Sequence, residues 1–75
     1  MTQIEPIELL TVVALIEDKP GENLVRGQVG TVVEIMGPDV YEVEFSDDAG
    51  QTYASVALRG SQLLRLHHEP CHQVA

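Results

Sequence analysis

The sequence predicts an all-β fold, a small barrel of five short strands, and three observations support it. β-branched and other apolar residues gather in short runs, and such residues suit a pleated strand. Gly, Pro and Asp separate these runs, as is typical of tight turns. One run, YEVEF, alternates apolar and acidic residues with the period of a strand that buries one face. The chain of 75 residues is therefore expected to form one domain with a small core.

The first predicted strand covers residues 9–17, LLTVVALIE, which are mostly apolar and contain no helix-capping signal. Residues 1–8 precede it as a lead-in, in which Pro6 favours an extended backbone. Residues 18–23 follow as a polar loop with a Pro-Gly pair. This is the longest predicted loop, so it is the connection most expected to carry function.

The second predicted strand covers residues 28–36, within the glycine-punctuated stretch LVRGQVGTVVEIM. Gly30 inside an apolar strand indicates either a β-bulge or a close approach of backbone, as at the corner of a barrel. Val29 and Val32 are three residues apart, so a bulge near Gly30 would return both side chains to one face. We therefore expect the barrel to bend at this glycine.

The remaining elements follow at short intervals. Residues 37–39 form a hairpin turn, after which the chain resumes as VYEVEFSD, the third strand. Residues 47–50 make the next tight turn, and the fourth strand covers residues 51–58. The core-facing side chains of these two strands are expected to be Tyr41, Val43, Phe45, Ala54, Val56 and Leu58.

A one-turn break precedes the last predicted strand. Residues 59–62 are too few for an α-helix but suit one 3-10 turn, and residues 63–66 form the fifth strand. Five short strands of this kind predict a small SH3-like barrel, because closure hides the sheet edges. An OB-type barrel is the alternative. The barrel domain is expected to span residues 1–66, with residues 67–75 as an irregular tail.

The charge and cysteine content limit the partners and the compartment. Twelve acidic residues against four basic ones give a net charge of −8, which disfavours nucleic acid and favours a basic protein. A single cysteine forms no internal disulfide, so a reducing cytoplasm is expected. The sequence has no secretion signal and no apolar stretch of membrane-spanning length, so we expect a soluble protein that does not bind membranes.

Two groups of residues are candidates for binding a partner. Glu34, Glu42 and Glu44 would form an acidic stripe across the second and third strands, although such charges also serve plain solubility. Arginine and tyrosine are enriched where proteins bind tightly. The predicted partner-binding residues are therefore Arg26, Tyr41, Glu42, Glu44, Tyr53 and Arg59.

The C-terminal tail carries four potential metal ligands within six residues. Its ligands are His67, His68, Cys71 and His72, of which His68, Cys71 and His72 are the first choices for Zn²⁺, Ni²⁺ or Cu²⁺. Their spacing matches no standard zinc finger, so opportunistic binding by a flexible tail is the alternative. A short tail does not hold a nucleophile and base rigidly, so we expect neither an enzyme nor a cofactor.

With LVRGQVGTVVEI, YEVEF and LRGSQLLRL in this order, the chain resembles the bacterial domain-of-unknown-function 4926 family. The resemblance covers about residues 7–66 and rests on core and turn residues. It implies an SH3-like barrel of uncharacterised role, and it carries over no catalytic or ligand residue. The glycine-rich segment is also similar to KOW-type modules, although the modules that grip RNA are basic.

The functional expectation is an acidic protein-interaction module. Analogy with the family suggests an accessory or antitoxin-like partner of another bacterial protein. A small metal-binding protein that uses the tail is the alternative function. Because so small a core gains stability from association, a homodimer also remains open.

Overall fold

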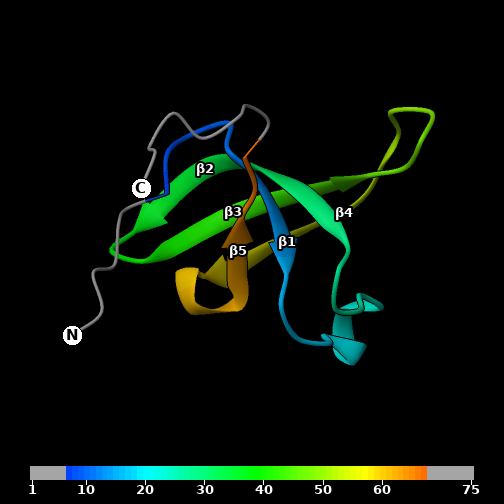
Figure 1. Ribbon diagram of the computed structural model, residues 1–75, viewed down its shortest axis with the longest axis horizontal. Coiled ribbons are helices and arrows are strands. Elements are labelled where there is room, and N and C mark those ends of the chain that lie inside the picture. The colour runs from blue at the N-terminus through cyan, green and yellow to red at the C-terminus, as the bar shows by residue number, and fades with distance from the viewer. Residues whose placement is uncertain (1–6, 68–75) are drawn as a thin grey trace, which may run out of the picture.

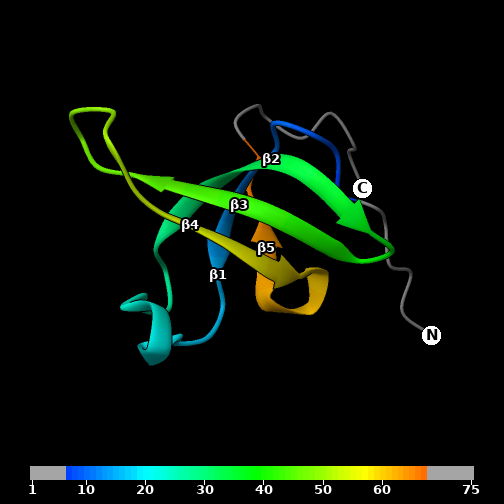
Figure 2. The same cartoon turned by 180° about the vertical axis from the view of Figure 1, so that it is seen from behind.

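The computed structural model describes residues 7–67 and contains one five-stranded antiparallel sheet (Figures 1 and 2). Within these residues there are two short 3-10 turns, η1 and η2, and no α-helix, so no described helix is long and apolar enough to cross a membrane. The elements are β1 (Val12–Leu15), η1 (Pro20–Glu22), β2 (Val29–Gly37), β3 (Val40–Ser46), β4 (Thr52–Arg59), η2 (Gly60–Gln62) and β5 (Leu63–Arg65).

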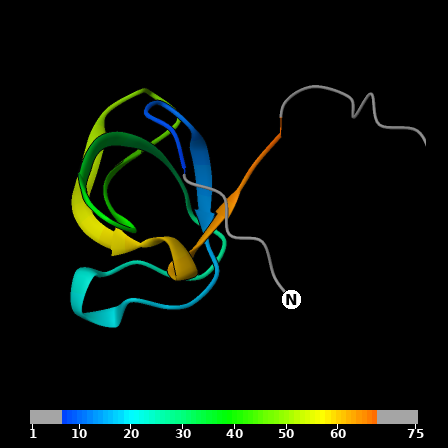
Figure 3. The same cartoon turned by 90° about the vertical axis from the view of Figure 1, so that its left-hand side faces the viewer.

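The strand order is β4-β3-β2-β1-β5, and every neighbouring pair is antiparallel. Strands β4 and β5 are adjacent in sequence but lie at the two ends of this order, joined by η2. Seen from the end, the sheet curls around a common interior (Figure 3). This arrangement confirms the predicted all-β fold of five short antiparallel strands with a 3-10 turn before the last strand. Strands β4 and β5 do not pair with each other, so the sheet curls without closing.

The core lies inside this curl and is contributed by every strand. In β3 the burial pattern alternates as predicted, because Tyr41, Val43 and Phe45 are buried while the two glutamates between them are only half-buried. The loop between β1 and β2 contributes Leu24, which is 1% exposed. The most deeply buried side chains are Val13, Leu15, Leu24, Val32, Val43, Phe45 and Leu58.

The predicted bulge at Gly30 is wrong, but the predicted close approach is right. The ladder runs without a shift through Gly30 opposite Phe45, and the two register shifts come later, between Val32 and Glu34 and between Ile35 and Gly37. Val29 is 47% exposed and Val32 is fully buried, as simple alternation requires. A Cβ at Gly30 would lie 2.7 Å from Val43 Cγ1 and 2.9 Å from Phe45 Cδ1. Glycine is therefore needed at this position for space.

The first strand is shorter than expected. It covers Val12–Leu15 instead of residues 9–17, because a turn precedes it and bends follow it. In the turn, Leu10 adopts a φ of 68° and Thr11 N donates to Glu8 O at 3.2 Å. After the strand, the loop contains η1, a second 3-10 turn that the sequence analysis did not predict. The other strands begin and end within about one residue of their predicted positions.

Candidate functional site

Three glutamates gather on the outer surface of β2 and β3. Glu42 and Glu44 alternate with the buried side chains of β3, so they point away from the core. Glu34 of β2 pairs directly with Glu42. We call Glu34, Glu42 and Glu44 the acidic face, and its position agrees with the acidic stripe predicted from the sequence.

The two residues that pair with Glu44, and the β4 residue that pairs with Glu42, are uncharged. Thr31 and Ser55 lie opposite Glu44 on its two sides, and Ala57 lies opposite Glu42 on the β4 side. Ser55 Oγ donates a hydrogen bond to Glu42 Oε2 at 2.6 Å, which fixes one carboxylate oxygen. Like charges directly opposite each other in a sheet destabilise it. The Glu34 and Glu42 pair is therefore an energetic cost to the fold.

Tyr41 does not belong to an exposed contact patch, and this prediction is wrong. Its side chain is only 5% exposed, because it occupies a core-facing position of β3. Its hydroxyl accepts a hydrogen bond from Ile7 N at 3.2 Å, so the lead-in to β1 is attached to the core. Tyr41 has a structural role.

The other predicted contact residues lie in different places. Arg26 and Tyr53 are exposed. Gln28 lies near both: its Nε2 donates a hydrogen bond to the Tyr53 hydroxyl at 2.9 Å, and its Oε1 accepts one from Val25 N at 2.6 Å. The backbone N of Arg26 donates to Asp18 Oδ1 at 2.8 Å. The six predicted partner-binding residues are therefore distributed over more than one surface.

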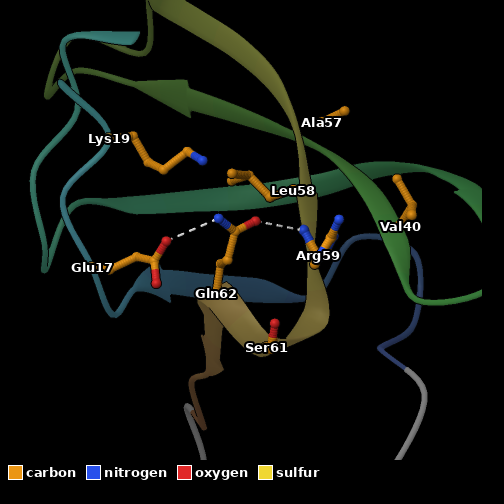
Figure 4. A pocket seen from close by; sticks show the side chains of 8 residues that line it. All are labelled: Glu17, Lys19, Val40, Ala57, Leu58, Arg59, Ser61 and Gln62. Atoms are coloured by element: carbon orange, nitrogen blue, oxygen red, sulfur yellow. Dashed lines mark hydrogen bonds between the residues drawn. The ribbon is translucent and has the colours of Figure 1, made fainter. Parts of the chain in front are cut away.

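Arg59 lines a depression of about 520 Å³ between the end of β4, the loop after β1, and η2 (Figure 4). Lys19 reaches into it from the loop, Leu58 contributes an apolar wall, and Ser61 lies on the η2 side. We call it the β4 depression. Lys19 and Arg59 are far apart in the sequence, so no local pattern predicts that both line this depression.

The polar groups of the β4 depression are partly fixed. Gln62 Nε2 donates to Glu17 Oε2 at 3.0 Å, and Arg59 N donates to Gln62 Oε1 at 2.9 Å. Gln62 thus connects the loop after β1 to the end of β4. Within residues 7–67, neither Lys19 nor the guanidinium of Arg59 forms an ion pair. Two cations therefore remain available to a ligand.

The predicted metal ligands cannot be placed. His68, Cys71 and His72 lie outside the described residues. His67 is described and exposed. Across residues 7–67, no three His, Cys, Asp or Glu side chains come together in a group that could hold a metal ion.

A comparison with protein families gives one match. The model of the family described as Domain of unknown function (DUF4926) matches residues 9–65, which span all five strands. No curated protein and no solved structure matches the chain.

Proposed function

We propose that this chain, which belongs to the DUF4926 family of unknown function, is a protein-interaction module whose acidic face binds a basic segment of another protein. The observation that carries the proposal is the placement of Glu34 directly opposite Glu42. This pair weakens the sheet, so a cationic partner would relieve a repulsion as well as form its own ion pairs. An accessory subunit of a larger protein fits this role.

The surroundings of the acidic face support the proposal. Ser55 holds one oxygen of Glu42 at 2.6 Å, so part of the site is ordered before a partner arrives. Glu42 and Glu44 are alternate residues of β3 and Glu34 lies beside Glu42 on β2, so the acidic face suits an extended or helical segment with several Lys or Arg side chains. The net charge of −8 would accelerate the encounter with a basic protein at low salt.

The test is capture of a partner by the tagged full chain from the lysate of its own organism, at about 50 mM and about 300 mM salt. We expect one stoichiometric basic protein, retained at the lower and lost at the higher salt concentration. The decisive step uses Glu34→Gln/Glu42→Gln. We expect this variant to bind the captured protein about fivefold or more weakly, because two charge pairs are lost.

The matched control is Glu22→Gln/Asp48→Asn. It removes the same charge from the loop after β1 and from the turn before β4, which are away from the acidic face. It should keep most of the affinity. Equal losses in both variants would show that only the net charge attracts the partner, and the proposed site would be wrong. Retention of no basic protein by the unmodified chain would also contradict the proposal.

A further inference from the structure

The outer edge of β4 is open for pairing. Strand β4 stands at one end of the sheet, and seven of its eight residues pair with β3, with a register shift that leaves Tyr53 unpaired. The six residues from Ala54 to Arg59 pair with β3 without interruption and with no strand on their other side. No backbone-to-backbone hydrogen bond joins Thr52–Arg59 to any other part of the described chain. An edge of this length is a template for an added strand, and neither lysine nor proline interrupts it.

The charge along β4 differs from that of the rest of the protein. The chain has twelve acidic residues, but none lies in β4, whose only charged residue is Arg59 at its end. There the strand meets the β4 depression, where Lys19 provides a second cation (Figure 4). The site thus combines free main-chain groups with two positive charges and one carboxylate, that of Glu17, one oxygen of which is held by Gln62. The positive charge favours an acidic ligand. A second copy of the chain is disfavoured, because each copy has a net charge of −8 and the two copies repel each other.

Hence we propose that the edge of β4 and the β4 depression form a second binding site, for an extended peptide segment that carries one carboxylate side chain. The main chain of the segment pairs with β4, and its carboxylate lies between Lys19 and Arg59. Gln62, fixed by its bonds to Glu17 and to Arg59 N, keeps the base of the depression in place. The chain repels long acidic runs, so one carboxylate is the preferred number.

This site is independent of the proposed function. It lies at the edge of β4 and takes a negative group, whereas the acidic face lies on the outer surface of β2 and β3 and takes a positive one. Failure of one proposal therefore leaves the other intact.

The test is an NMR titration of the ¹⁵N-labelled full chain with the peptide acetyl-Thr-Val-Glu-Val-Thr-amide. A second titration uses the same peptide with Gln in place of Glu. Because main-chain pairing supplies affinity with little sequence selectivity, this probe suffices. We expect the Glu peptide to shift the amides of Ser55 and Ala57, and to bind roughly tenfold more tightly than the Gln peptide, as one charge-assisted contact provides.

Matched variants locate the carboxylate. Lys19→Met and Arg59→Met should each reduce the preference for Glu over Gln severalfold, while Arg26→Met, with the same loss of charge outside the depression, should not. Each variant is first checked for an unchanged fold by its own spectrum. Equal binding of the two peptides, shifts confined to other strands, or no shifts at millimolar peptide would overturn the proposal. A free protein that dimerises through β4 would assign the edge to a second copy and would overturn it too.

Discussion

Substitution of Gly30 by alanine tests how closely β2 and β3 approach each other. The added Cβ would lie 2.7 Å from Val43 Cγ1, 2.9 Å from Phe45 Cδ1 and 2.9 Å from the backbone O of Glu44. The two side chains are fully buried, so they have no solvent to move into, and the carbonyl belongs to the strand paired with β2. Overpacking of this kind costs about 1–3 kcal/mol.

The assay is urea denaturation of Gly30→Ala beside Gly21→Ala. Gly21 lies in η1, and a Cβ there would meet no atom within 4 Å, so this control should leave the free energy of unfolding unchanged or slightly raised. For a domain of this size, 1 kcal/mol corresponds to about 4–8 °C in Tm. A Gly30→Ala variant as stable as the unmodified protein would refute the steric argument and show that β2 and β3 separate easily.

Two further substitutions test particular hydrogen bonds by the same assay. Tyr41→Phe should lower the free energy of unfolding by about 0.5–1.5 kcal/mol, because Ile7 N loses its acceptor, whereas Tyr53→Phe, at an exposed position, should change it little. Asp47→Ala should cost about 1 kcal/mol, because Oδ1 of Asp47 accepts from Ala49 N and Gln51 N, both at 2.9 Å, while Asp48→Ala should be nearly neutral. Equal effects within either pair would contradict the assigned roles.

Alternation and turn chemistry were sufficient to predict most of the fold. The pattern of β3 identified its buried side chains, and the Pro and Gly signals located the turns. The length of β1 was overestimated because an apolar run does not reveal where strand pairing stops. Leu9 and Leu10 are as apolar as β1 itself, yet they form a turn in which Leu10 has a positive φ.

The position of the bulge could not be read from glycine alone. A glycine in a strand signals either a bulge or a close approach, and at Gly30 the packing of Val43 and Phe45 decides between them. The register shifts of β2 lie between Val32 and Glu34, where there is no glycine, and between Ile35 and Gly37 at the end of the strand.

The candidate sites were only partly predictable. Alternation in β3 places Glu42 and Glu44 on one face. Glu34 has the same parity in β2 as the buried Val32, and only the register shift between them brings Glu34 opposite Glu42. The β4 depression joins Lys19 and Arg59 through the curl of the barrel, and no local pattern encodes that contact. Tyr41 illustrates the opposite error, because residue type suggested a contact role while its strand position already indicated burial.

The repulsion between Glu34 and Glu42, on which the proposed binding role of the acidic face rests, is tested most directly by a double-mutant cycle of Glu34→Gln and Glu42→Gln. The free energy of unfolding is measured by urea denaturation at low and high salt. Each single substitution should stabilise the protein, and the second should add less once the first is present. This coupling should correspond to a repulsion of about 0.2–1 kcal/mol that shrinks as salt rises. A coupling of zero, or an attraction, would show that the acidic face costs the fold nothing, and would contradict the inference that it awaits a basic partner.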